Sequence, residues 1–138
     1  MNTPPVQQAI KFVDLQIVSF NLLNKKIGNK AITNELNLEI KFKAINQLKN
    51  EGNLENNFAI DFIIELSDVN KDFVLKMQAY AFFDTNFICD EQFLQSDFVK
   101  YNAPAIAFPF IRTYISNVTL NSGYNPIILP AFNFSATD

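Results

Sequence analysis

The stretch from Asn102 to Phe134, N-A-P-A-I-A-F-P-F-I-R-T-Y-I-S-N-V-T-L-N-S-G-Y-N-P-I-I-L-P-A-F-N-F, decides the fold. Its first part predicts one amphipathic helix suited to packing on a sheet. An apolar stripe recurs every four residues and is widened by two isoleucines; its members are Ile106, Phe110, Ile111, Tyr114, Ile115 and Val118. Four residues are expected mainly off this stripe, namely Arg112, Thr113, Asn117 and Thr119.

The two ends of the helix are signalled differently. Pro104 and Pro109 each favour a first-turn position, so the start is expected within 103–108. The end is sharper, because Gly123 supplies a left-handed cap residue and Pro126 blocks any continuation. An extended apolar tail is expected after it.

Upstream of the helix, alternating apolar residues predict four consecutive antiparallel strands. The first begins near Ile10, and its alternation changes phase between Ile17 and Val18, which indicates a β-bulge. The second covers 36–44 and has one polar face. The third covers 58–67, and the fourth, after a hairpin, covers 73–83.

These elements predict an α+β fold in which a four-stranded antiparallel sheet carries a C-terminal helix on one face, in two layers. The chain has 138 residues, so we expect a single domain over 1–138. Residues 1–9 contain two prolines and no periodic pattern, and we expect them to form a flexible arm. Residues 87–101, with several scattered aromatic side chains, predict a short helix or an irregular lead-in to the main helix.

Composition and charge exclude several partners. The net charge is −3 and the pI is about 4.9, so no basic field is available and nucleic acid is not expected as a partner. No apolar segment approaches the ~18–20 residues that span a bilayer, which excludes membrane insertion. The single cysteine, Cys89, cannot form an internal disulfide, and no signal peptide precedes the first strand, so we expect a cytoplasmic protein.

The sequence does not predict an enzyme. It contains no histidine, no Gly-rich phosphate loop and none of the common hydrolase or metalloprotease motifs. Cys89 has no base to activate it, and Asp90-Glu91 is interpreted as a favourable pair of acids at a helix start. Arg112 is interpreted as a structural hydrogen-bond donor or ion-pair partner, including across a subunit contact, with ligand binding as the alternative. No catalytic residue, metal or cofactor is therefore expected.

The aromatic content is high, with 15 Phe and 4 Tyr but no Trp. Ordinary core packing would explain many of these residues, and the alternative is a surplus of apolar surface meant for a partner. The predicted fourth strand is apolar on one face and mixed on the other. Such a strand needs cover on both sides, from the helix and a loop or from another subunit.

The last third of the chain resembles the SecB family of bacterial protein-export chaperones. The residues that carry the resemblance are Phe108-Pro109-Phe110-Ile111-Arg112, then Gly123-Tyr124-Asn125-Pro126, then Ile127-Ile128-Leu129 and Pro130-Ala131-Phe132-Asn133-Phe134. Their order and spacing follow the family nearly throughout. Including the four strands, the likeness extends from Ile10 to Phe134, with specific motifs in the last third and a topological match before them.

The resemblance implies an ATP-independent holdase, assembled as a dimer of dimers, whose apolar grooves bind unfolded polypeptides. On this basis we predict client contacts at Phe82, Phe83, Phe87, Phe98, Tyr101, Phe108, Tyr124, Phe132 and Phe134. We predict an oligomer interface at Phe110, Arg112, Tyr114 and Val118. The sequence stops four residues after Phe134, before the family's second helix and SecA-docking tail, so the resemblance does not extend to an interaction with SecA.

Three alternatives remain open at this point. A short SecB-like protein could serve one dedicated client, such as an antitoxin, rather than many preproteins. A structural adaptor could use the same apolar surface for a fixed subunit partner. A small-ligand carrier could enclose an apolar pocket between helix and sheet.

Overall fold

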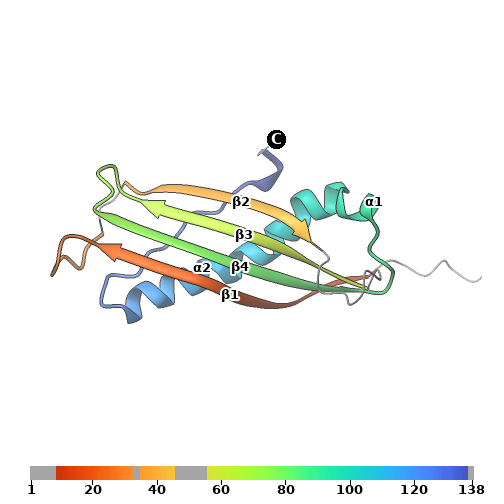
Figure 1. The fold of residues 1–138 in the computed structure, drawn as a ribbon, viewed down its shortest axis with the longest axis horizontal. Coiled ribbons are helices and arrows are strands. Elements are labelled where there is room, and N and C mark those ends of the chain that lie inside the picture. Colours follow the sequence, from red (N-terminus) through yellow and green to blue (C-terminus); the bar gives the residue numbers. More distant parts are fainter. Residues whose placement is uncertain (1–8, 33–34, 46–55, 137–138) are drawn as a thin grey trace, which may run out of the picture.

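The computed structural model describes residues 9–32, 35–45 and 56–136, and it confirms the predicted four strands followed by a helix. The strands are β1 (Ile10–Asn24), β2 (Asn37–Ile45), β3 (Asn57–Ser67) and β4 (Phe73–Thr85). All neighbours pair antiparallel in the order β1-β4-β3-β2, so β1 and β2 form the two edges (Figure 1). The predicted arm lies outside the described residues except for Ala9, which exchanges two hydrogen bonds with Asn86.

Four helical pieces follow the sheet in the described residues. They are α1 (Glu91–Leu94), a π-helical turn (Phe98–Asn102), the long helix α2 (Ala103–Asn121) and a 3-10 turn (Phe134–Ala136). The start of α2 falls within the predicted interval, and its end is the predicted one. Gly123 has φ +97°, and the Tyr124 amide donates to the Thr119 carbonyl at 3.1 Å, which is the cap expected of a left-handed glycine.

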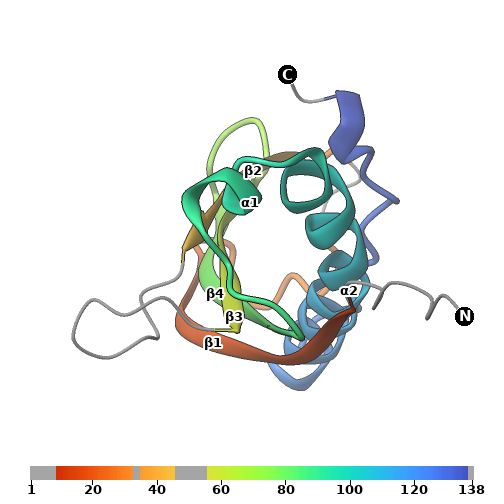
Figure 2. The same cartoon turned by 90° about the vertical axis from the view of Figure 1, so that its right-hand side faces the viewer.

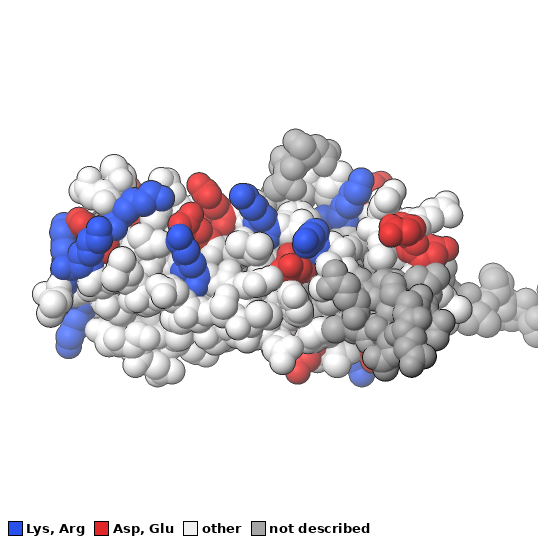
Figure 3. Space-filling model, viewed as in Figure 1, with Lys and Arg blue, Asp and Glu red and all other residues white. Residues whose placement is uncertain are grey.

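The sheet forms one layer, and α2 lies along one of its faces as the other layer (Figure 2). Large side chains of β3 and β4 fill the space beneath α2, among them Phe58, Phe62 and Leu75, which are fully buried. The opposite face of the sheet carries the polar residues predicted for β2. Figure 3 shows charged side chains gathered over β2 and β3 and mostly uncharged ones over the middle of β1.

The face of α2 that is buried differs from the predicted stripe. Residues spaced by four line the buried face, namely Ala103, Ala107, Ile111, Ile115 and Thr119. Ile106 and Phe110, which headed the predicted stripe, are 43% and 50% exposed. Phe110 instead stacks on Phe12 of β1 at 4.5 Å, so the predicted stripe marks the flank of α2 that faces the edge strand. The prediction that Thr119 lies off the apolar face was wrong, since its side chain is fully buried.

The edge strand β1 contains the predicted bulge and one more. Its pairing with β4 shifts register between Ile17 and Ser19, as the change of phase indicated, and again between Phe12 and Asp14. The extra residues are Val18 and Val13, which are 48% and 49% exposed. The second bulge was not predicted.

Candidate functional site

An open groove lies between the start of α2 and the end of the chain, and we call it the aromatic groove. Its volume is about 540 Å³, and its lining residues are Tyr101, Asn102, Ala105, Ile106, Phe132, Asn133, Phe134 and Ser135. None of these described lining residues is charged. The groove therefore offers aromatic and aliphatic surface together with a few amide and hydroxyl groups.

Two lining residues, Phe132 and Phe134, belong to a set of five packed phenylalanines, which we call the groove cluster: Phe42, Phe62, Phe108, Phe132 and Phe134. Phe134 stands at its centre, with ring centroids 4.8 Å from Phe132, 5.2 Å from Phe42 and 5.5 Å from Phe108. Because β2, β3, α2 and the end of the chain all contribute, the groove cluster is fixed by tertiary structure rather than by one element. Phe132 is half-buried at the groove wall.

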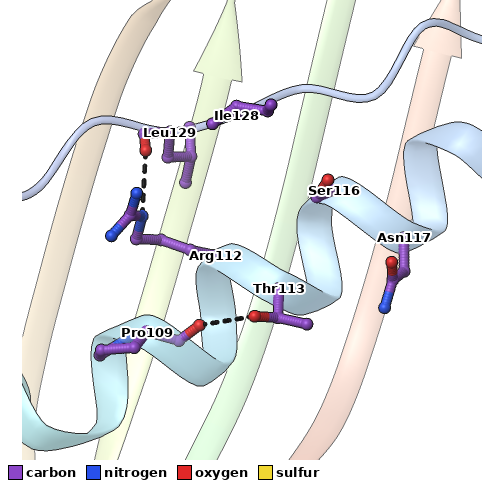
Figure 4. Close-up of a pocket in the computed structure, with 7 residues that line it drawn as sticks. All are labelled: Pro109, Arg112, Thr113, Ser116, Asn117, Ile128 and Leu129. Carbon is purple, nitrogen blue, oxygen red and sulfur yellow. Dashed lines mark hydrogen bonds between the residues drawn. The ribbon is translucent and has the colours of Figure 1, made fainter.

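The segment from Tyr124 to Phe134, called here the C-terminal segment, brings Phe132 and Phe134 to the groove without joining the sheet. Two side chains of α2 hold its backbone. The Thr119 hydroxyl accepts from the Ile127 amide at 3.0 Å and donates to the Ile115 carbonyl at 2.8 Å. Arg112 Nε donates to the Leu129 carbonyl at 3.0 Å (Figure 4). The position of the groove wall thus depends on two polar residues of the helix.

The structure places the predicted client-binding residues in different environments. Tyr101 and Phe132 line the groove, and Phe98 is half-buried in the π-helical turn just before it. Phe83, Phe108 and Phe134, in contrast, are at most 3% exposed. For these three, direct contact with a client stays a prediction; in the isolated chain the core covers Phe83 and Phe108, and Phe134 lines the groove with little exposed surface.

The remaining predicted contacts do not extend the groove. Phe82 lies on the outer face of the sheet beside Tyr80, with ring centroids 6.2 Å apart. Phe87 packs against Phe93 after β4 at 4.8 Å. Tyr124 packs against Phe73 at the opposite end of α2, about 28 Å of helix away from Tyr101. The predicted residues therefore do not form one continuous surface in the isolated chain.

The predicted interface residues also separate into two groups. Phe110 stacks on Phe12, and Tyr114 meets Phe20 edge-on at 6.0 Å, so both lie on the β1 side of α2. Arg112 lies on the opposite flank, beside Leu129. Val118 is half-buried. One flat partner surface cannot cover Arg112 and Phe110 equally.

The region around Cys89 is built for packing. The thiol is fully buried, and its sulfur is 3.4 Å from the Thr85 hydroxyl. Burial is the main cause that raises the pKa of Cys89; the negative charge of Asp90 acts in the same direction, and the Thr85 hydrogen bond opposes them. Asp90 caps α1 by accepting from the Phe93 amide at 2.8 Å, which confirms its interpretation as a helix-start acid.

Sequence reasoning missed several groove residues. Phe42 and Phe62 fit the inward alternation of β2 and β3 like any core residue, so no local signal marks them as members of the groove cluster. Ile106 was assigned to the sheet-facing stripe, although it lines the groove. Thr119 could have been found from the spacing of four that links it to Ile111 and Ile115.

Comparison with known proteins identifies the family. The model of the family described as preprotein translocase subunit SecB matches residues 4–137. The chain belongs to the SecB family. Among curated relatives, an uncharacterised protein of Methanocaldococcus jannaschii is 29% identical over 96% of this chain and 84% of its own length. The protein-export protein SecB of Anaplasma phagocytophilum is 49% identical over 35 residues, which are 25% of this chain and 22% of that protein.

A solved structure of a SecB-like chaperone shares the fold. The SecB-like chaperone of Mycobacterium tuberculosis, in complex with a peptide from the HigA1 antitoxin, superposes with a TM-score of 0.67 at 15% identity. The match covers 90% of this chain and 88% of that one. SecB is not an enzyme family. In the described part of this chain, no cluster of metal-binding side chains is present, and no helix has the length and apolar character to cross a membrane.

Proposed function

We propose that the protein is an ATP-independent chaperone that binds unfolded or partly folded polypeptides in the aromatic groove. The observation that carries the proposal is the groove itself, an open cavity of about 540 Å³ with an apolar wall and an uncharged lining. A folded protein hides the side chains that such a surface would bind. The groove therefore selects for chains that have not folded, and membership of the SecB family supports the same role.

The chemistry of the groove suits clients of varied sequence. Tyr101, Ile106 and Phe132 provide broad contact area that makes few demands on side-chain identity. The amides of Asn102 and Asn133 lie at the same groove, where a client backbone would need hydrogen-bond partners. Binding the unfolded state alone delays folding by mass action, without any need for a nucleotide.

The proposal includes self-association, with a dimer of dimers as the expected form. Half-exposed apolar side chains recur along β1 and the adjacent flank of α2; they are Val13, Val18, Leu23 and Phe110, each 48–50% exposed. Because an exposed apolar band of this kind favours a partner surface, we place the subunit contact there. Light scattering on the purified chain measures the assembly.

We expect such a chaperone to act in the cytoplasm, where Cys89 stays reduced.

Titration into a fluorescently labelled, permanently unfolded polypeptide tests the function. We expect micromolar or tighter binding to the unfolded chain and none to the same polypeptide in its folded form. Replacing both Ile106 and Phe132 by serine should weaken binding at least tenfold, about 1.4 kcal/mol. The matched control is Ile27→Ser, which removes a side chain that is 97% exposed on the β1–β2 connection.

Two results would redirect the proposal. Equal weakening by the control and the double variant would place the binding site elsewhere. Binding to one partner only, with none to unrelated unfolded chains, would favour a dedicated chaperone or an adaptor. A specific observation favours the alternative of a dedicated chaperone, because the M. tuberculosis chaperone of the same fold is in complex with an antitoxin peptide.

A further inference from the structure

A second groove lies on the outer flank of α2, and the unused hydrogen-bond donors of its polar lining have no role in the proposed function. Its volume is about 360 Å³. It is lined by Pro109, Arg112, Thr113, Ser116, Asn117, Ile128 and Leu129, all from α2 and the C-terminal segment (Figure 4). We call it the Arg112 groove.

Arg112 is only partly used by the protein itself. Its Nε donates to the Leu129 carbonyl at 3.0 Å, and this is the single hydrogen bond that the guanidinium makes within the described residues. The two terminal nitrogens, which carry four N–H donors, are left for another acceptor. Ser116 lies one helical turn further on, points toward the same segment, and has no side-chain partner in the described chain (Figure 4).

The charge of Arg112 is also uncompensated. It is the one charged residue among the residues of α2, and the only arginine of the sequence. No acid lines the Arg112 groove, and the two ion pairs found in the described part of the chain, Lys26–Asp72 and Lys76–Glu65, are formed by other residues. A half-buried guanidinium with free donors and no counter-charge favours an anion of matching planar shape.

We propose that the Arg112 groove binds a carboxylate group. The two terminal nitrogens of Arg112 would hold the two carboxylate oxygens side by side, and the Ser116 hydroxyl would donate to one of them. Ile128, which is 76% exposed, and Pro109 would pack against the carbon chain that carries the carboxylate. A single positive charge balances one carboxylate, whereas a phosphate group would bring more charge than one guanidinium neutralises.

Two sources can supply this group, an acidic side chain of a bound polypeptide or one of a second copy of this chain. The inference is independent of the aromatic groove, which lies at the N-terminal end of α2. A failure of client binding in the aromatic groove would therefore leave it untouched, and its own failure would leave the proposed function standing.

Because the chain has one arginine, labelling with ¹⁵N-arginine gives one side-chain Nε–Hε resonance, which reports on this groove alone. We would titrate N-acetyl-glutamic acid α-amide, with N-acetyl-glutamine α-amide as the uncharged match. The expected result is a saturable shift with the glutamic acid compound and none with the glutamine compound. Ser116→Ala should lower the affinity for the glutamic acid compound about three- to tenfold. The affinity is measured from the chemical-shift changes of the backbone amides of residues 113–117 and 127–129.

A charge-matched pair of variants separates the groove from general electrostatics. Arg112→Gln should abolish the response of the backbone amides, whereas Lys30→Gln, which removes an exposed charge on the β1–β2 connection, should preserve it. If a second copy supplies the carboxylate, the Nε–Hε resonance will shift over about a hundredfold change in protein concentration, and Arg112→Gln will lower the assembled mass. Both results support the site and identify its source. A resonance that responds equally to both compounds, or to neither compound and not to concentration, overturns the proposal.

Discussion

Two groups of phenylalanines pack against the inner face of the sheet, and they differ in what lies beside their partly buried rings. The sheet-end cluster consists of Phe58, Phe83, Phe87 and Phe93, at the end of the sheet near α1. At its centre Phe58 and Phe83 stack with an interplanar angle of 3° and are both fully buried. The groove cluster has a buried centre too, at Phe134. Its partly buried Phe132 lines the aromatic groove, whereas the partly buried Phe87 and Phe93 of the sheet-end cluster pack against each other at 4.8 Å.

This difference separates stability from binding. Where the chain covers the whole ring, as at Phe58 and Phe83, an aromatic side chain contributes its whole apolar area to folding. Where one side stays open, part of that area is left for a ligand. The same residue type therefore serves the fold in one cluster and, in our proposal, a client in the other.

The largest expected effect is on the sheet-end cluster. Phe58→Ala should lower the free energy of unfolding by about 3–5 kcal/mol, because it opens a cavity where collapse is restricted on all sides. Phe132→Ala should cost less, since its ring is only half-buried. Urea denaturation of both variants measures the difference. Equal losses would mean that the two clusters do not differ in the way described.

The next effect concerns the segment that carries the groove wall. Thr119→Val keeps the side-chain volume but removes the acceptor of the Ile127 amide, which should cost about 1–3 kcal/mol. Hydrogen exchange at Ile127 and Leu129 should accelerate, and binding of unfolded polypeptide should weaken. The control is Thr113→Val on the exposed side of α2, where the change should stay within about 0.5 kcal/mol. Unchanged exchange in Thr119→Val would show that packing alone holds the segment.

A matched pair of glycines gives a smaller test. Gly123 and Gly28 have φ +97° and +88°, and an added Cβ would meet no atom within 4 Å at either position. Alanine at each should therefore cost about 1 kcal/mol of backbone strain and nothing else. Only Gly123→Ala should also weaken client binding, because that turn sets the direction of the C-terminal segment. If the two variants bound client equally well, the turn at Gly123 would have no influence on binding in the aromatic groove.

The smallest effect is a pH dependence near the sheet-end cluster. Burial raises the pKa of Cys89, so the folded protein keeps the thiol neutral at a pH where the unfolded chain ionises. This contribution to stability is fully present below the ordinary thiol pKa of about 8.5 and is lost as the pH rises above it. Between about pH 8 and 9.5 the wild type should lose less than about 1 kcal/mol relative to Cys89→Ala. Urea denaturation at each pH measures the free energy of unfolding of both proteins. If wild type and Cys89→Ala lost the same free energy over this pH range, the prediction would be wrong.

The sheet was largely predictable because its signals are local. Alternation located all four strands, and the change of phase at Ile17 and Val18 located one bulge. The end of α2 followed from Gly123, whose left-handed conformation needs no tertiary information. Each of these features depends on residues that are neighbours in the sequence.

The buried face of α2 and the groove were harder to predict because the sheet decides them. Ala103 and Ala107 are too small to stand out in a hydrophobic pattern, yet they let the helix approach the strands. The apolar pattern includes Phe110 because its ring does make an apolar contact. That contact is with Phe12 of the edge strand β1 rather than with the core under the buried face of α2. The groove cluster joins residues of β2, β3, α2 and the chain end, and no spacing along the sequence predicts that these residues meet.

The two bulges of β1 have a consequence for the behaviour of the protein in a crowded solution of unfolded chains. An uninterrupted edge strand of 15 residues would present a long row of free backbone groups, on which other chains could build an open-ended sheet. The bulges at Val13 and Val18 divide that row into short runs, and each bulge increases the local twist. Contacts at this edge are thereby limited to a few residues, which favours a defined partner over fibrillar growth.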